Sequence, residues 1–523
     1  MRSKGMVLVG IAVAIVVIGM AAPAGAAALT AKQELGKLLF FDKISEPGSM
    51  ACAACHAPSA GFTGPNAGIN RHGGVYRGAM PQRFGNRRPP SAAYATFSPV
   101  FHFDAGEGLF FGGNFWDGRA TGEHLGNPAA DQALGPFLNP VEQNNPDKAT
   151  VLEKVAMSHA DLWYEVWNEP IAWDTPMAID TNYDRVGLAI AAYEASPEVN
   201  QFSSKFDLFW ANAGVMGMDV AAIDIGNWRD YEDLGLDRKE LRGLALFNDE
   251  DKGKCSLCHV LDPVYDEMGN ELPPVFTDFS FDNVGLPRNP ENPFYDMDEV
   301  FLDDGTPINP EGENWIDPGL GGFLAGHSNP AWAAMAPENM GKHKVPTLRN
   351  VAKGPGEEFP KSFMHNGVFT SLKEVVHFYN TRDVEDWPAP EVAMNVNMDE
   401  LGDLGLSKSE ETDIAAFMMS LSDGYVAQGG GRMDLARGLA NAQVSPNPFR
   451  GATTVRYVVP ERGRVTVGVY DVVGRRVATL VDELQDPGRH AARFSRPGLA
   501  SGVYFFRIEA SGRQSATKAV VID

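Results

Sequence analysis

Cysteine is scarce in this sequence: only four occur among its 523 residues. So low a count excludes a fold held together by many disulfide bonds. All four lie in two short motifs, CAACH over residues 52–56 and CSLCH over residues 255–259. The thiol chemistry of the chain is therefore concentrated at two places, each with a histidine directly after the second cysteine.

Long apolar runs are missing after Ala22. Before it, Arg2 and Lys4 precede an apolar stretch that begins at Met6, and Ala24-Gly25-Ala26 forms a small-residue cleavage site. This order is typical of a secretory signal peptide over residues 1–26. A retained membrane anchor is the alternative, because the run approaches the length that spans a bilayer. We expect cleavage, no transmembrane anchor afterwards, and an exported protein of the periplasm or cell envelope.

Basic residues are also few. The chain has 44 Lys and Arg against 68 Asp and Glu, a formal net charge of -24. Such a charge repels phosphate backbones, so neither nucleic acid nor an anionic lipid surface is expected as a partner. It would instead attract a basic redox protein, or simply keep an exported protein in solution.

The spacing of the two cysteine motifs predicts covalent haem c. Two thiols three residues apart can attach to the two vinyl-derived carbons on one edge of a porphyrin, and the following histidine reaches the iron. A disulfide bond or half of a zinc site would leave that histidine unexplained. The attaching cysteines are Cys52, Cys55, Cys255 and Cys258, and the proximal ligands are His56 and His259. In bacteria such haems are attached after export, which agrees with the signal peptide.

Similar helical patterns precede the two motifs. Residues 30–41 place three leucines on one helical face, and Asp237 with Glu240 forms a capping box before a second apolar pattern. Both are typical of the opening helix of a cytochrome c domain. Further helices are predicted over 151–167, 183–196 and 407–423. Residues 261–341, rich in Pro, Gly, Asn and Asp, predict an ordered loop region.

Composition changes after Gly424, where three consecutive glycines suggest a linker over 425–443. Beyond it, short runs rich in Val, Tyr, Phe and Thr predict strands. These strands cover 453–459, 464–471, 475–480, 490–494 and 502–510. We therefore expect a mostly α chain with two cytochrome c-like haem domains, 27–230 and 231–424, followed by a small all-β immunoglobulin-like sandwich over 444–523.

Two resemblances sharpen these expectations. The C-terminal sequences SPNPFRGATTVRYVVP, VYDVVGRRVATLV and GLASGVYFFRIEA resemble immunoglobulin-like domains related to the FlgD-type and type IX secretion sorting domains, which sort or anchor exported proteins. Residues 30–424 carry, in order, ELGKLLFFD, CAACH, FWDGRA, QALGPFLNPVE, CSLCH, KVPTLRNVA and FMHNGVFTSLKEVVHFYN. These resemble bacterial di-haem cytochrome c peroxidases, a family that includes MauG. The resemblance implies two facing cytochrome c domains, one haem for peroxide chemistry and one for electron transfer.

The same resemblance implies catalytic residues. Peroxide cleavage needs a group that moves a proton between the two oxygens, and Glu142 has this role, with Gln132 orienting peroxide or water. Pro136 shapes the pocket between them. Trp116, in FWDGRA, lies between the haems in the family and relays an electron. Without the family, a glutamate in a Pro-rich loop would be read as solvated, and a tryptophan as part of a core.

Two further positions concern the sixth ligand of each iron. His72 follows His56 by sixteen residues, where the peroxidase branch carries a distal histidine and the MauG branch carries none. Tyr379 follows His365 of MHNG by fourteen residues, where the peroxidase branch has Met and the MauG branch has Tyr. A phenolate oxygen stabilises ferric iron and lowers its potential. The other candidates for this second ligand are His377, Met364 and Met340, and a core tyrosine is the structural alternative.

The resulting hypothesis is an exported di-haem peroxidase that reduces hydrogen peroxide with electrons from a small redox protein, a cytochrome c or cupredoxin. The alternatives are a MauG-like oxidase of a partner protein and an electron-transfer cytochrome without turnover. Calcium, which the family binds between its haem domains, stays open, because Arg87-Arg88 stand where Arg-Asn is usual. A homodimer also stays open.

Overall fold

A computed structural model describes residues 28–266, 269–356, 358–427, 431–432, 443–459, 462–472, 474–485, 488–495, 500–510 and 513–522. The predicted signal peptide and most of the predicted linker lie outside these ranges. Among the helices of the described ranges, none combines the length and the apolar character needed to cross a membrane.

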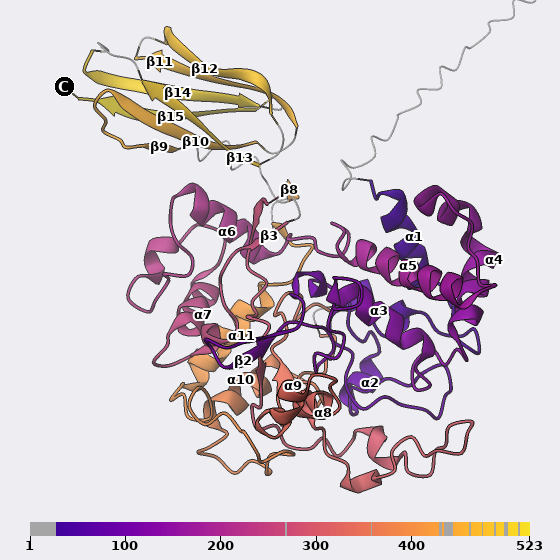
Figure 1. Cartoon of the computed structure of the whole chain (residues 1–523). Helices are drawn as coiled ribbons and strands as arrows, with labels where there is room; N and C mark the ends of the chain where they lie inside the picture. Colours follow the sequence, from indigo (N-terminus) through magenta and orange to yellow (C-terminus); the bar gives the residue numbers. More distant parts are fainter. Residues whose placement is uncertain are drawn as a thin grey trace, which may run out of the picture.

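Four helices form the first helical unit: α1 (Ala31–Phe41), α3 (Pro128–Leu138), α4 (Lys148–Trp167) and α5 (Pro176–Glu194). Thr30 and Gln33 close a capping box at the start of α1, as its position before an apolar run favours. The buried face of α1 packs against α5, and Gly36 is required there because a Cβ would overlap the carbonyl oxygen of Ala189. Figure 1 shows α1, α4 and α5 packed together at one side of the molecule.

The second helical unit repeats this arrangement with α7 (Arg238–Asn248), α10 (Leu372–Thr381) and α11 (Lys408–Met419), and α6 (Lys205–Val215), which precedes the unit in the chain, packs against its core. The predicted capping box at Asp237 is present, and Ser407 with Glu410 forms another at the start of α11. Helix α7 packs against α11, and a Cβ on Gly243 would overlap the carbonyl oxygen of Asp413. The opening helix of each unit thus uses one glycine to approach the backbone of a later helix, which supports an internal repeat.

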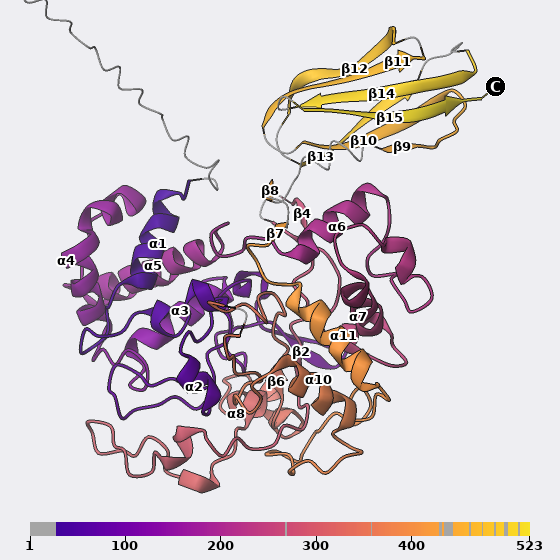
Figure 2. The ribbon, with the colours of Figure 1, turned by 180° about the vertical axis from the view of Figure 1, so that it is seen from behind.

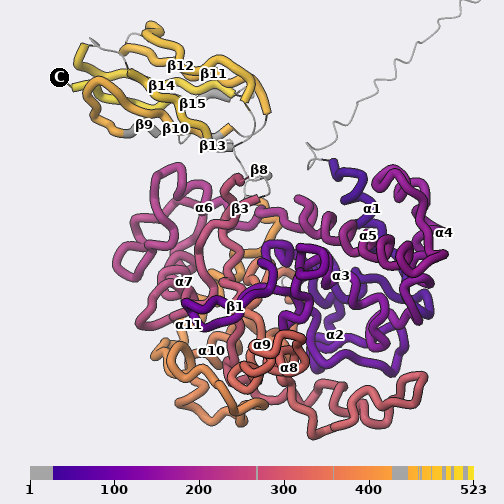
Figure 3. Tube along the Cα trace, viewed as in Figure 1, coloured from indigo at the N-terminus to yellow at the C-terminus, as the bar shows by residue number. Residues whose placement is uncertain are grey.

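Residues 261–341 run mainly as loops, as predicted, but include short elements. These are β3 (Val264–Tyr265), β4 (Glu271–Leu272), β5 (Phe281–Asp282), α8 (Gly319–Ala325), α9 (Pro330–Ala334) and three 3₁₀ turns, η6 (Pro293–Asp296), η7 (Gly312–Asn314) and η8 (Ala336–Asn339). Strand β6 (His343–Lys344) pairs with β5. Part of the segment crosses to α2 (Ala67–Arg71) of the first unit, where Asn289 donates to the carbonyl of Gly73. Figure 3 shows this crossing below α2.

The short elements that complete the helical part are β1 (His102–Asp104), β2 (Leu109–Phe111), β7 (Val426–Ala427), β8 (Gly431–Arg432) and the 3₁₀ turns η1 (Cys52–Ala54), η2 (Pro58–Ala60), η3 (Ala95–Phe97), η4 (Trp228–Tyr231) and η5 (Cys255–Leu257). Strands β1 and β2 form a hairpin in which Phe103 faces Phe110. Turns η1 and η5 hold the two cysteine motifs, so both motifs begin with the same local structure.

The C-terminal residues form a β-sandwich of two antiparallel sheets, shown from behind in Figure 2. One sheet has the order β13-β10-β9 and the other the order β12-β11-β14-β15. The strands are β9 (Gln443–Ser445), β10 (Ala452–Val459), β11 (Gly463–Asp471), β12 (Arg476–Gln485), β13 (Gly488–Ser495), β14 (Gly502–Ala510) and β15 (Arg513–Val521). Val455, Val467 and Phe506 are buried between the sheets. The predicted fold class, mostly α followed by an all-β sandwich, is confirmed.

Candidate haem and peroxide site

The first cysteine motif forms a tight turn that fixes the direction of its histidine. The backbone N–H of His56 donates to the carbonyl of Cys52 at 3.0 Å. The ring Nδ1 of His56 lies 3.2 Å from the carbonyl oxygen of Phe62, so this nitrogen carries the proton and Nε2 keeps its lone pair. Burial raises the pKa of the Cys52 thiol and of the Cys55 thiol to about 12.

The second motif repeats this geometry. The N–H of His259 donates to the carbonyl of Cys255 at 2.9 Å, and its ring Nδ1 lies 2.9 Å from the carbonyl oxygen of Phe276. Burial lowers the pKa of His259 to about 4, although its hydrogen bonds to the backbone act the other way. The imidazole is therefore neutral, which is the form that binds iron.

One continuous cavity joins the two motifs. Its lining includes all four cysteines and both motif histidines, together with Trp116, Gln132, Pro136, Glu142 and Tyr379. Two cysteines three residues apart, followed by an imidazole with an available Nε2, are the donor set that covalent haem c requires. The residues present thus fit two haem c groups, and two covalent haem c groups are what the motifs predicted.

The peroxide residues come from α3 and the turn after it. Gln132 lies on α3 and not in a loop, because Asn127 caps this helix and Pro128 begins it. Pro136 is inside the same helix. Glu142 follows in a turn, where its N–H donates to the carbonyl of Asn139 at 3.0 Å. The structure thus brings the three residues to the same cavity.

The carboxyl of Glu142 is placed in an environment that favours its protonated form. Burial raises the pKa of Glu142, against the opposing effects of the positive charge of Arg119 and a hydrogen bond with Asn139. A carboxyl with a raised pKa holds a proton more readily than an exposed one, which suits a group that takes up and returns a proton. Arg119 and Asn139 also line the cavity.

Trp116 is fixed between the two helical units. Only 6 % of its surface is exposed. Its indole Nε1 donates to the carbonyl of Arg88 at 2.8 Å, and its own carbonyl accepts from the N–H of Lys344 at 2.8 Å. The ring of His365 lies edge-on to the indole at 6.3 Å between ring centroids. Contacts from both units therefore hold the indole against the cavity.

Tyr379 projects from α10 into the cavity, and burial raises its pKa far above the ordinary value. Of the other candidates for the second sixth ligand, Met364 also lines the cavity, whereas His377 and Met340 are not among the described residues that line it. Both ring nitrogens of His377 are engaged, Nδ1 by Glu411 at 2.9 Å and Nε2 by Glu385 at 3.2 Å.

His72 is placed away from this cavity. It ends α2, and 73 % of its side chain is exposed. Its Nδ1 lies 3.5 Å from a carboxylate oxygen of Glu291. Among the residues described for the cavity lining, His72 does not occur. In this conformation its ring lies outside the cavity that contains His56.

Sequence reasoning missed several residues of the site. Arg119 lies in the FWDGRA segment, but no local sequence pattern predicts that it lies near Glu142. Glu194, near the end of α5, also lines the cavity, and burial raises its pKa to about 8. Glu194 falls within the apolar pattern of its helix, so its burial could have been predicted from the sequence.

Comparisons with known proteins agree with this geometry. Residues 30–214 match the family described as di-haem cytochrome c peroxidase, and residues 443–523 match a secretion system C-terminal sorting domain. The methylamine utilization protein MauG of Paracoccus denitrificans is 32 % identical over 411 residues, covering 74 % of this chain and 88 % of that protein. Cytochrome-c peroxidase IdrP1 of Denitromonas iodatirespirans is 25 % identical, covering 75 % of this chain and 81 % of that protein.

A solved structure extends the likeness to the fold. The diheme peroxidase BthA from Burkholderia thailandensis superposes with a TM-score of 0.56 at 28 % identity, covering 77 % of this chain and 89 % of that chain. The similarity therefore spans both helical units and not only the cysteine motifs.

Proposed function

The chain belongs to the di-haem cytochrome c peroxidase and MauG family, and from this premise we propose that it is an exported peroxidase that reduces hydrogen peroxide. The electrons come from a small redox protein, a cytochrome c or cupredoxin. The observation that carries the proposal is the single cavity that contains both motifs, a buried carboxyl at Glu142 and a fixed indole at Trp116. When bound, the two haem groups supply one iron centre that cleaves the peroxide bond and a second that passes electrons.

Glu142 and Gln132 handle peroxide in this proposal. The carboxylate of Glu142 takes a proton from the near oxygen of peroxide and returns it to the far oxygen, which leaves as water. The amide of Gln132 hydrogen-bonds the peroxide and holds it in line for this transfer. The positive charge of Arg119 opposes the effect of burial on the pKa of Glu142 and favours the ionised carboxyl, the form that accepts the proton. Two electrons and two protons convert each peroxide into two waters.

Trp116 and Tyr379 handle electrons. Trp116 lies between the two units and needs no rearrangement to pass an electron, because its indole N–H and its backbone carbonyl are both hydrogen-bonded. Tyr379 would hold the iron of the second haem through its phenolic oxygen, which would lower the potential of that haem. Calcium has no role in this proposal.

A MauG-like oxidase is the second candidate function, and Tyr379 favours it. A low-potential site is a poor acceptor from ordinary cytochromes and a good store of oxidising equivalents, which an oxidase of a partner protein would use. A plain electron-transfer cytochrome is the third candidate, and the buried acid at Glu142 argues against it.

The C-terminal sorting domain indicates export to the cell envelope or surface. We propose haem domains over 27–230 and 231–424, joined by the linker 425–443 to the sorting domain.

Three assays on the holoprotein separate the candidates. Consumption of hydrogen peroxide with a reduced cytochrome c or cupredoxin supports the peroxidase. Peroxide-dependent oxidation of a partner protein without such a donor supports the oxidase. No reaction with peroxide in either assay would leave an electron carrier and would contradict the proposal.

A further inference from the structure

Arg88 lines the haem cavity with most of its hydrogen-bond donors unused. Its Nε donates to the carbonyl of Met364 at 3.0 Å, and its backbone N–H donates to the carbonyl of His365 at 2.8 Å. Its carbonyl in turn accepts the indole N–H of Trp116. A guanidinium has five N–H donors, and within the described ranges Arg88 uses only the one on Nε. Its Nη1 and Nη2 are therefore available to an occupant of the cavity.

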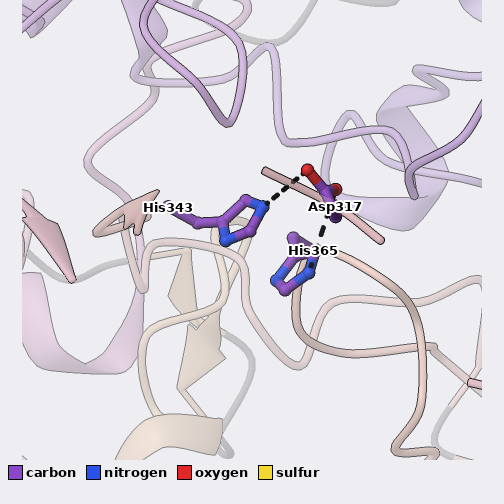
Figure 4. A group of neighbouring side chains, drawn as sticks. All are labelled: Asp317, His343 and His365. Carbon is purple, nitrogen blue, oxygen red and sulfur yellow. Dashed lines mark ion pairs between the residues drawn. The ribbon is translucent and has the colours of Figure 1, made fainter. Parts of the chain in front are cut away.

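The carboxylates bonded to this segment pair with Arg87 and not with Arg88. The Nη1 of Arg87 lies 2.6 Å from Asp117, and its Nε and Nη2 each lie 2.7 Å from an oxygen of Asp317. Asp317 also faces the two histidines that Figure 4 labels. Both carboxylates are thus engaged elsewhere. Among the residues that the structure describes, none with a carboxylate forms an ion pair with Arg88.

A second cation near Arg88 is also without a carboxylate partner in the described part of the chain. Lys361 lines the same cavity, and its Nζ donates to the backbone carbonyls of Ala60, Asn350 and Lys353 at 3.0, 3.1 and 3.0 Å. Burial lowers the pKa of Lys361 to about 7, and the charge of Arg88 adds to this effect. The three carbonyls use all the N–H groups of the ammonium. Lys361 can therefore attract an anion by its charge, but Arg88 has the donors to bind it.

The positive charge of Arg88 lacks a counter-ion from the described residues. Burial lowers the pKa of Arg88 to about 10, and of the charges around it only the phenol of Tyr76 acts in the opposite direction. Removing an ion from water is unfavourable unless it is paired, so a cation in such a place normally has an anion beside it. In a chain with a net charge of -24, acidic side chains are not scarce. The occupant of the cavity is therefore the expected source of the anion.

Covalent haem c brings carboxylates into this cavity, because each haem carries two propionates. A guanidinium matches a carboxylate with two parallel N–H···O bonds. Burial lowers the pKa of His56, and the positive charge of Arg88 lowers it further. At His259 burial lowers the pKa without a contribution from Arg88. The haem attached at the first motif is therefore the better match for Arg88.

We propose that Nη1 and Nη2 of Arg88 bind a propionate carboxylate of the haem at the first motif, and that this ion pair raises the reduction potential of that haem. A nearby cation favours ferrous iron, since ferric iron carries one more positive charge. The carbonyl of Arg88 holds the indole of Trp116, so one residue connects the haem with the proposed relay. The ion pair rests on the haem groups of the proposed function but needs no peroxide turnover. Failure of the peroxidase assay would leave it unaffected.

The first test is the resonance Raman spectrum of the ferric holoprotein, in which the propionate bending band of a haem shifts when its carboxylate loses a charged partner. We expect a shift in Arg88→Gln and the wild-type position in Arg83→Gln. Arg83 is a buried arginine five residues earlier, bonded to Asn144 and Asp303 and not among the described residues that line the cavity. An unshifted band in Arg88→Gln, or the same shift in both variants, would overturn the proposal.

The second test is a potentiometric titration of the same proteins. At a fixed applied potential, the ratio of ferrous to ferric iron at the first motif should fall by about tenfold in Arg88→Gln, because a cation is lost. Arg83→Gln should keep the wild-type ratio. An equal ratio in wild type and Arg88→Gln would contradict an effect of Arg88 on the potential.

A free anion is the other source of negative charge, and chloride is the probe for it. If chloride occupied the place of the propionate, added chloride would change the ratio in wild type, and the Raman band would be the same in wild type and Arg88→Gln. That pair of results would overturn the propionate assignment. The proposal expects no effect of chloride on the wild-type ratio.

Arg88→Lys covers the case in which the glutamine variant does not fold. It keeps the positive charge but loses the planar fork. We expect the propionate band to shift, while the ratio of ferrous to ferric iron stays close to wild type. An unshifted band in the lysine variant would contradict binding by Nη1 and Nη2, and a tenfold lower ratio would show that charge does not set the potential.

Discussion

The indole Nε1 of Trp116 donates a hydrogen bond of 2.8 Å to the backbone carbonyl of Arg88. This bond connects the residue proposed to relay electrons with the loop that contains Arg88. Together with the burial of Trp116, of which only 6 % is exposed, it restricts the movement of the indole. A relay residue held in this way exchanges electrons without first having to rotate.

Replacing Trp116 by Phe should therefore keep the fold and slow the relay. Phenylalanine fills most of the volume but is much harder to oxidise, and it cannot donate to Arg88. We expect electron exchange between the two haem sites to slow by about tenfold or more, measured after rapid half-reduction. The matched control is Trp315→Phe, because Trp315 packs against Phe294 and Tyr295 instead. Similar slowing in the control would show a general structural effect.

Replacing Tyr379 by Met should raise the potential of the second haem site. A thioether stabilises ferrous iron, whereas a phenolate stabilises ferric iron, so a shift on the order of 100 mV is expected. Potentiometric titration of the holoprotein measures it. Tyr231→Phe serves as the control, since the hydroxyl of Tyr231 bonds the carbonyl of Asp219 in another part of the second unit. An unchanged potential in Tyr379→Met would assign the ligand to Met364 or another residue.

Replacing His72 by Ala should leave the ferric electron paramagnetic resonance spectrum unchanged. Its side chain is mostly exposed and pairs with Glu291, so its loss removes no ligand in this conformation. The reference variant is Glu291→Gln, which weakens the ion pair but keeps the histidine. A change from a low-spin to a high-spin signal in His72→Ala alone would show that His72 does bind the first iron.

Glu194 predicts a pH dependence of stability. Its carboxyl is buried, and its pKa is raised to about 8, so between its unfolded pKa and pH 8 the folded state binds a proton that the unfolded state lacks. Stability must then fall as pH rises through this window. Glu194→Gln, a neutral mimic, should stabilise the protein by roughly 3 kcal/mol at pH 7 and hardly at all below pH 4.5.

Thermal or denaturant unfolding of wild type and Glu194→Gln across pH 4 to 9 measures this effect. Glu198→Gln is the control, because Glu198 is half-exposed and pairs with Lys37. If the gain in Glu194→Gln is the same at pH 4.5 and at pH 8, burial of the carboxyl does not govern its ionisation.

Local signals predicted the helices that open each unit well. Asp237 caps its helix as expected, since a capping box depends only on residues three apart, and Thr30 and Ser407 form capping boxes of the same kind. Helix α5 begins at Pro176, before the predicted start at Tyr183, because Thr175 and Pro176 form a start signal that the apolar pattern alone does not reveal. Strands β9 and β15 were not predicted, and both depend on pairing with distant strands.

The residues of the candidate site also divide into those that a local sequence signal predicts and those that only the fold brings together. The cysteine motifs and Glu142 could be found from spacing and family segments, because each is a short sequence. The pairing of Arg87 with Asp317 could not, since 230 residues separate them and only the fold joins them. His72 shows the opposite case: its spacing predicted a ligand position, but the contact with Glu291 decides where its side chain lies.

The central claim, that Glu142 moves the proton in peroxide cleavage, is tested most directly by the rate of hydrogen peroxide consumption by holoprotein with a reduced donor. Wild type should consume peroxide, and Glu142→Gln should be slower by about a hundredfold or more, because the amide cannot accept the proton. Glu153→Gln, on the exposed face of α4, should match wild type. Equal rates in wild type and Glu142→Gln would contradict the account.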